Sequence, residues 1–192
     1  MNEVVTSYAE APNQSVTAGG VTFVYRDLGP RNGIPVVFLV HLAAVLDNWD
    51  PRVVDGIAAK HRVIAFDNQG VGGSSGKTPS TIEAMAADAV TFIEALGLER
   101  VDRHGFSMGG MVAQVVALTH PELVRKLILT GTAPAGGKGV RPVVAVAQLD
   151  TVRGFLAEAT ERGVQLLLPT DVVAATSFSA DAPHDVVATD SI

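Results

Sequence analysis

The sequence predicts an α/β fold in three layers, in which helices cover both faces of a mostly parallel sheet. Short apolar runs, typical of strands buried on both faces, alternate with amphipathic helical stretches. A glycine-rich turn from Gly105 to Gly110 lies between one such run and the helical stretch that follows it. Alternating strands and helices favour parallel pairing, because a parallel connection needs a crossover long enough to hold a helix.

The expected strands are short runs of aliphatic and β-branched residues. Val21–Leu28 ends at the turn-forming pair Gly29-Pro30, and Pro35–Val40 (PVVFLV) has the continuous apolar pattern of a central strand. Further strands are expected at Arg62–Phe66, Val101–Phe106, Val124–Leu129 and Val164–Leu168. Each of these four follows a helical stretch, which is the order of a parallel sheet with helical crossovers.

The expected helices have apolar residues at three- and four-residue steps. The clearest is Ser80–Leu96, where Ser80 and Glu83 form a capping-box pattern and Gly97 marks the end. Other helices are expected at Arg52–Lys60, Ser107–Thr119 and Gln148–Arg162.

A break rich in glycine and proline, GTAPAGGKGVRP, follows the Val124–Leu129 strand. We therefore expect a core at 1–135, a linker at 136–147 and a helix–strand segment at 148–192 that packs on the same sheet. The chain of 192 residues is long enough for one buried core.

Composition narrows the function classes. The absence of cysteine excludes disulfides, thiolate catalysis and cysteine-ligated zinc. With a net charge of −6 and no basic patch, nucleic acid is not an expected partner. No apolar run approaches the roughly 18 residues that cross a bilayer, and no leader pattern is visible, so a cytoplasmic protein without a membrane partner is expected. Histidines and carboxylates show no metal-ligand spacing, so neither metal nor cofactor is expected. Oligomeric state stays open.

The strongest chemical signal is the G-x-S-x-G pattern of Gly105, Ser107 and Gly109. It follows an expected strand and opens an expected helix, which is the context of a nucleophile elbow. Such a turn raises the serine hydroxyl above the strand ends and places helix N–H groups beside it. The alternative is a glycine-rich turn whose serine has no chemical role.

From Pro35 to about Gly136 the chain resembles the α/β-hydrolase superfamily, above all its cofactor-free enol-lactonases and haloperoxidase-like hydrolases. The matching pieces are VVFLVHLAAVLDNWDP, VIAFDNQGVGGSS and HGFSMGGMVAQVVALTHPELVRKLILTGTAP. The resemblance implies a truncated hydrolase fold without a cap domain, acting on a small-molecule acyl substrate. It implies Ser107 as the nucleophile, with the Met108 and Ala43 N–H groups as the oxyanion hole; Leu42 is the fallback for Ala43.

Three positions depart from the family pattern. Leu42 stands where glycine is common, and Gln69 replaces the arginine of the D-x-R-G-x-G-x-S loop. Arg103 lies within an expected buried strand, where an unpaired charge is costly.

The family order of serine, acid and histidine leaves one candidate triad. His41, His61 and His104 precede the serine, and His120 fits a helix cap, which leaves His184 as the base. Asp171 is the acid that directly follows a later strand. The alternative is that Asp171 is a turn residue and His184 an exposed tail residue.

The segment from about Leu149 to Ile192 also resembles part of the C-terminal domain of phosphoglycerate kinase. The chain therefore looks like a composite, whether a natural protein, a fragment or a chimera. Three hypotheses remain: a serine hydrolase for a small ester, lactone or related acyl substrate; a catalytically impaired hydrolase scaffold; and a nucleotide-binding module.

Overall fold

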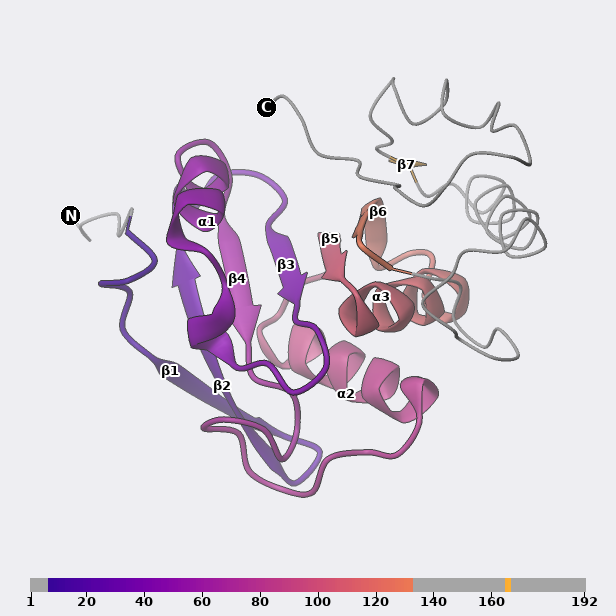
Figure 1. The fold of residues 1–192 in the computed structure, drawn as a ribbon. Helices are drawn as coiled ribbons and strands as arrows, with labels where there is room; N and C mark the ends of the chain where they lie inside the picture. The colour runs from indigo at the N-terminus through magenta and orange to yellow at the C-terminus, as the bar shows by residue number, and fades with distance from the viewer. Residues whose placement is uncertain (1–6, 133–164, 167–192) are drawn as a thin grey trace, which may run out of the picture.

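The computed structural model describes residues 7–132 and 165–166. The strands of these residues form one mixed sheet in the order β1-β2-β4-β3-β5-β6-β7 (Figure 1). Strands β1 and β2 are antiparallel to each other, β2 is antiparallel to β4, and the pairs from β4 to β7 are parallel. The strands are β1 (Gln14–Ala18), β2 (Val21–Leu28), β3 (Val36–Leu39), β4 (Val63–Phe66), β5 (Val101–Phe106), β6 (Val124–Thr130) and β7 (Gln165–Leu166).

Helices cover both faces of this sheet (Figure 1). Helices α2 (Ile82–Ala95) and α3 (Met108–Thr119) bury their apolar residues in one core cluster, and α1 (Pro51–Ala58) buries its own in a second cluster on the opposite face. A 3-10 turn, η1 (Leu46–Asn48), leads from β3 toward α1. The predicted α/β class, with a mostly parallel sheet between helices, is confirmed.

The larger core cluster contains a small group of aromatic rings that contact one another. Phe66 stacks on Phe92 with ring centroids 4.2 Å apart, and the Phe23 ring lies 5.6 Å from that of Phe92. These three rings come from β4, α2 and β2 and are almost fully buried. Aliphatic residues fill the remainder of both clusters, as the composition leads one to expect.

The predicted elements differ from the structure mainly at their ends. The predicted cap Ser80 is wrong: the cap is the next residue, Thr81, whose hydroxyl accepts from the Ala84 N–H at 3.2 Å, and helix α2 begins at Ile82. Two adjacent hydroxyl residues compete for the cap, and local sequence does not choose between them. Gly97 does end the helix, with φ +68°. Strand β1 and η1 were not predicted. The helix expected at Gln148–Arg162 and the linker at 136–147 lie outside the described residues.

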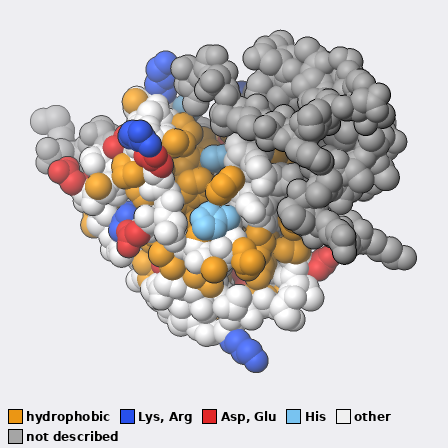
Figure 2. All heavy atoms as spheres, in the orientation of Figure 1, with side chains coloured by type: hydrophobic (Ala, Val, Ile, Leu, Met, Phe, Trp, Pro, Cys, Tyr) orange, Lys and Arg blue, Asp and Glu red, His pale blue; other side chains and the backbone are white. Residues whose placement is uncertain are grey.

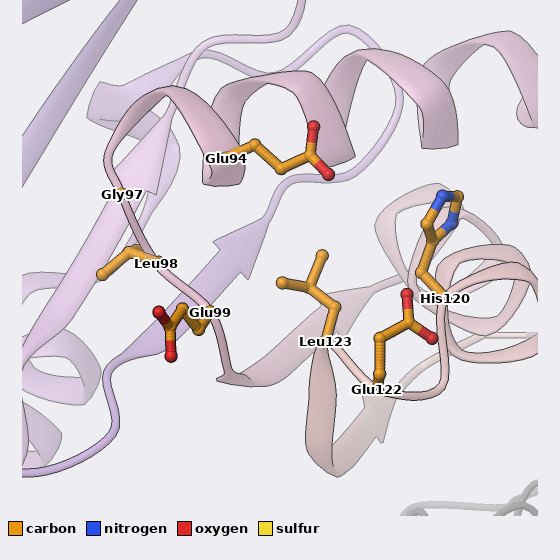
Figure 3. Close-up of a pocket in the computed structure, with 7 residues that line it drawn as sticks. All are labelled: Glu94, Gly97, Leu98, Glu99, His120, Glu122 and Leu123. Atoms are coloured by element: carbon orange, nitrogen blue, oxygen red, sulfur yellow. The ribbon is translucent and has the colours of Figure 1, made fainter.

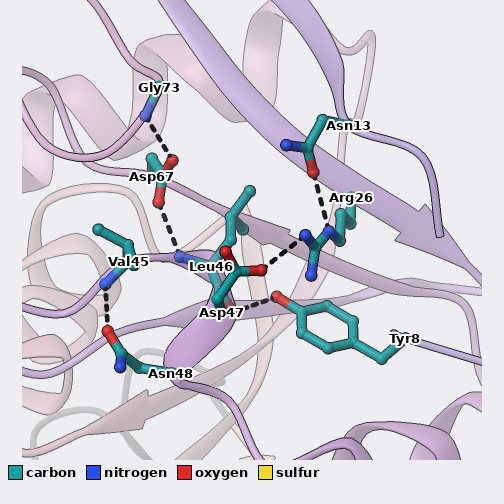
Figure 4. Close-up of polar contacts among 9 residues, drawn as sticks. All are labelled: Tyr8, Asn13, Arg26, Val45, Leu46, Asp47, Asn48, Asp67 and Gly73. Atoms are coloured by element: carbon teal, nitrogen blue, oxygen red, sulfur yellow. Dashed lines mark hydrogen bonds and ion pairs between the residues drawn. The ribbon is translucent and has the colours of Figure 1, made fainter. Parts of the chain in front are cut away.

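The loop after β4 is tied down by Asp67, which is buried (Figure 4). Its carboxylate accepts from the Leu46 N–H at 2.8 Å and from the Gly73 N–H at 2.9 Å. The Ser74 hydroxyl donates to the Asp67 carbonyl at 2.7 Å and accepts from the Val24 N–H at 2.9 Å. This network joins η1, the glycine-rich loop and β2 without the arginine that Gln69 replaces.

Tyr8 and Arg26 hydrogen bond to the same region (Figure 4). The Tyr8 hydroxyl donates to the Leu46 carbonyl at 2.8 Å, and the Arg26 guanidinium binds both Asn13 and Asp47. The segment that leads from β3 into α1 is therefore fixed on both sides of Leu46.

None of the helices in the described part of the chain has the length and hydropathy that crossing a membrane requires.

Candidate active site

Ser107 occupies the sharp turn between β5 and α3, with φ 53° and ψ −119°. A side chain in this sparsely populated region costs about 1–3 kcal/mol, and the cost persists only when surrounding contacts impose it. Three hydrogen bonds supply those contacts: the Ser107 N–H donates to the Thr130 carbonyl at 3.0 Å, and the Ser107 carbonyl accepts from the Gly110 N–H at 2.9 Å and the Thr132 hydroxyl at 2.6 Å. The strained geometry of a nucleophile elbow is therefore present.

The glycines of the pattern allow the elements around Ser107 to approach closely. A Cβ on Gly105 would stand 2.5 Å from the Gly109 carbonyl oxygen and from the Gly110 Cα. A Cβ on Gly109 would stand 2.7 Å from the Val40 carbonyl oxygen and would clash even more closely with the Leu39 carbonyl. The spacing of the pattern therefore reflects backbone contacts of α3 with β5 and β3.

Two turns at the same edge of the sheet carry the predicted oxyanion groups. Met108 is the first residue of α3, where helix geometry gives its N–H no intrahelical acceptor. Ala43 lies in the turn after β3, which pairs with β5 and ends beside it. Its φ of 58° and the Ala44 N–H, which donates to the His41 carbonyl at 3.3 Å, define that turn.

Leu42, which stands where glycine is common in the family, is not itself strained, because the left-handed backbone of this turn falls on the next residue, Ala43. The Leu42 carbonyl accepts a hydrogen bond from His41 Nδ1 at 2.9 Å, and its side chain is 70% exposed. A Leu42 side chain is thus compatible with the turn, although the donors' positions relative to Ser107 Oγ stay predictions.

No histidine in residues 7–132 binds a carboxylate in the way a triad requires. His41 contacts the Leu42 carbonyl, His104 Nε2 lies 3.0 Å from the Thr130 hydroxyl, and His120 Nδ1 lies 2.9 Å from the Thr119 hydroxyl. The predicted base His184 and acid Asp171 lie outside the described residues. The triad Ser107, Asp171 and His184 therefore stays a prediction.

Two buried side chains of β5 have their ionised forms disfavoured by burial. Arg103 is fully buried, and none of its three side-chain nitrogens has a hydrogen-bond partner among the described residues. Desolvation lowers the pKa of Arg103 to about 9 and the pKa of His104 to about 4. The predicted buried arginine is thus confirmed, and it has no partner among the described residues.

His104 makes stability depend on pH. Its pKa falls from 6.5 in the unfolded chain to about 4 in the fold, so between these values the unfolded state binds the extra proton. The free energy of unfolding therefore rises with pH from about 4 to 6.5, by up to about 3 kcal/mol, and this contribution is constant above that range. Thermal unfolding across pH 4–7 measures the rise.

The matched comparison for this effect is His104→Val, which we expect to flatten the profile between pH 4 and 6.5. His61→Gln, on an exposed histidine, should leave the slope as it is in the parent chain. An unchanged slope in His104→Val would show that other groups cause the pH dependence.

A hollow lies at the end of β5 and β6 opposite to Ser107, where the strands begin (Figure 3). It is a hollow of about 380 Å³ around Leu98 and Leu123, with carboxylates and an imidazole at its rim. The lining residues are Glu94, Gly97, Leu98, Glu99, His120, Glu122 and Leu123. It holds no serine, and the described residues contain no cluster of three metal-ligating side chains. The hollow is therefore separate from the elbow.

Sequence reasoning missed the residues that hold the elbow from β6. The Thr130 carbonyl accepts from the Ser107 N–H, and the Thr132 hydroxyl donates to the Ser107 carbonyl, so the end of β6 and the residues just after it hold Ser107 on both sides. The strain at Ala43 was also missed. No local pattern marks either feature, because both arise from neighbouring strands.

Comparison with known proteins identifies the fold family. Residues 34–188 match the family model described as alpha/beta hydrolase fold. A non-heme chloroperoxidase of Streptomyces lividans is 38% identical over 122 residues, which are 62% of this chain and 44% of that protein. An alpha/beta hydrolase fold protein from Chitinophaga pinensis superposes with a TM-score of 0.67 at 39% identity, over 86% of this chain and 55% of that one.

The enol-lactonase from Burkholderia xenovorans LB400 superposes with a TM-score of 0.57 at 29% identity, over 62% of this chain and 47% of that one. This chain thus spans about half the length of the relatives that it matches. The predicted resemblance to haloperoxidase-like and enol-lactonase hydrolases is confirmed.

The second predicted resemblance is also found, and its identity is highest over one short stretch of the chain. A stretch of 45 residues, 23% of this chain and 11% of the relative, is 62% identical to a phosphoglycerate kinase of Clavibacter michiganensis subsp. michiganensis. This partial similarity agrees with a chain of composite origin.

Proposed function

Because the chain belongs to the α/β-hydrolase fold family, we propose that it is a serine hydrolase for a small ester, lactone or related acyl substrate. The observation that carries the proposal is the backbone of Ser107, which holds a serine in a strained turn between a strand and a helix N-terminus. Backbone strain of this kind persists where structure imposes it, and it clusters at catalytic positions. The names of its relatives, a chloroperoxidase and an enol-lactonase, support small-molecule chemistry.

In this mechanism Ser107 Oγ attacks the carbonyl carbon while its proton passes to His184, which Asp171 orients. The negative charge on the carbonyl oxygen is stabilised by the N–H groups of Met108 and Ala43. Collapse of the tetrahedral intermediate breaks the ester bond, and the alcohol leaves with the proton from His184. Water then attacks the acyl-enzyme while His184 accepts its proton, and the acid product leaves as Ser107 Oγ takes that proton back. The proposal needs no metal or cofactor, and it includes a cytoplasmic location.

Turnover of p-nitrophenyl acetate tests the role of the serine. We expect Ser107→Ala to lower kcat by at least about a thousandfold, because a triad without its nucleophile retains only the rate that the oxyanion hole and binding supply. The variant keeps a Cβ in the same strained turn, so its thermal unfolding should match that of the parent chain. Turnover that survives in a folded Ser107→Ala protein would refute the proposal.

The triad assignment has its own test. His184→Ala should lose turnover to about the same extent as Ser107→Ala, since residues that act as a unit are not additive. If the parent chain hydrolyses the ester and His184→Ala retains full turnover, another group is the base. A folded parent chain with no turnover above background would instead support the impaired scaffold.

A further inference from the structure

Two apolar side chains stand exposed directly beside the elbow. Phe106, the residue before Ser107, is 38% exposed, and Leu42, the residue before Ala43, is 70% exposed. Each precedes a residue of the proposed site: Phe106 ends β5, and Leu42 lies in the turn that follows β3, the strand that pairs with β5. Exposed apolar side chains that gather at one place often mark a binding surface.

The Phe106 ring is held by its neighbours. It meets the His41 ring edge-on with centroids 5.5 Å apart, and its centroid lies 6.4 Å from that of Trp49. A Cβ added to Gly131 would stand 2.9 Å from the ring, so the Gly131 backbone is also close to it. Phe106 is therefore held by neighbouring rings and backbone, while 38% of the residue stays exposed.

Trp49 extends this arrangement inward. Its ring lies 4.8 Å from that of Phe38 and 5.5 Å from that of His104, both of which are buried. The result is a row of rings from the surface beside Ser107 to the core cluster under α1. Hydrophobic side chains gather around histidine side chains on the face shown in Figure 2.

The row of rings is apolar and contains no carboxylate, ammonium or guanidinium group. Three of its rings, those of Phe106, Trp49 and Phe38, carry no ionisable group. Burial keeps the His104 ring neutral by lowering its pKa to about 4. The imidazole of His41 is hydrogen bonded to the Leu42 carbonyl. An apolar, uncharged group would gain contact area here, whereas a charged group would lose hydration without finding a counter-charge in the row.

We propose that Phe106 and Leu42 form an apolar wall that receives the acyl group of the substrate. The wall makes the site selective for esters whose acyl group is an uncharged alkyl or aryl chain, over acetyl esters and charged acyl groups. This inference rests on the proposed function. The acyl side is chosen because the acyl group stays bonded to Ser107 after the alcohol has left, so contacts with it act in both steps.

The experiment compares kcat/KM for p-nitrophenyl acetate, butyrate and hexanoate, which share one leaving group. For the parent chain we expect kcat/KM to rise at least about tenfold from acetate to hexanoate, as each buried methylene favours binding in the transition state. In Phe106→Ala the hexanoate-to-acetate ratio should fall by about tenfold. In Phe106→Leu, which keeps an apolar side chain, the preference for hexanoate should persist.

Val53→Ala is the matched control. Val53 is a comparably exposed apolar residue of α1, 43% exposed, that belongs to neither the ring row nor the core clusters. Its truncation should leave the ratio unchanged. Thermal unfolding of each variant confirms that it is folded.

The outcomes separate the two claims. Turnover that depends on Ser107, with the same hexanoate-to-acetate ratio in Phe106→Ala as in the parent chain, overturns the apolar wall and leaves the proposed function standing. A parent chain without preference for the longer esters overturns it as well. If the parent chain hydrolyses none of the three esters, the proposed function and the wall both fail.

Discussion

Replacing Arg103 by leucine is expected to raise the free energy of unfolding by about 1–4 kcal/mol. Arg103 lies two residues after Val101 on β5, so both side chains point to the same face, where Val101 joins the core cluster of α2 and α3. The guanidinium is fully buried there without a hydrogen-bond partner among the described residues. With a pKa of about 9 it still carries its charge at neutral pH, so folding removes that charge from water without compensation.

Urea unfolding of the parent chain and of Arg103→Leu measures this effect as a shift of the midpoint at constant slope. The matched control is Arg125→Leu on the neighbouring strand. Arg125 donates two hydrogen bonds to the buried Asp102 carboxylate, at 2.8 Å and 2.6 Å, so its loss should lower stability by about 1–3 kcal/mol. A midpoint that falls in Arg103→Leu would show that the guanidinium has a stabilising partner.

Replacing Gly109 by alanine is expected to lower the free energy of unfolding by about 3 kcal/mol. The added Cβ would stand 2.7 Å from the Val40 carbonyl oxygen and closer still to the Leu39 carbonyl. Both obstacles are backbone atoms, so α3 and β3 would have to move apart. That movement would also separate Ser107 from Ala43, and we expect ester turnover to fall with stability.

Gly56→Ala provides the opposite case. Gly56 lies inside α1, and a Cβ there would meet nothing within 4 Å. Alanine should therefore raise the free energy of unfolding by about 0.5–1 kcal/mol, because it favours the helix. Chemical unfolding of both variants compares them directly. If Gly109→Ala is as stable as the parent chain, the close approach of α3 to β3 is not a requirement of the fold.

The parts of the fold that sequence predicted are those with a strong local pattern. The run PVVFLV and the sequence around the elbow each specify their element within a few residues, and β3, β5 and α3 form there. Strand β1 was missed because QSVTA is short and mostly polar, and it becomes a strand by pairing with β2. Its pairing is a tertiary contact, which outweighs a weak local preference.

In the candidate site, too, the residues that could be predicted are those that a local sequence pattern marks. The glycines and Ser107 could be predicted because the turn itself demands them. The positive φ of Ala43 could not, because no glycine marks it and the surrounding structure imposes it. The base and acid depend on chain order rather than on local pattern, so Asp171 and His184 stay predictions.

Covalent labelling at Ser107 tests the central claim most directly. After reaction with a fluorophosphonate, intact mass spectrometry of the parent chain should show one adduct per molecule, and peptide mapping should place it on Ser107. Ser107→Ala should show none. A parent chain that unfolds cooperatively yet forms no adduct, or forms one at another residue, would contradict Ser107 as an activated nucleophile.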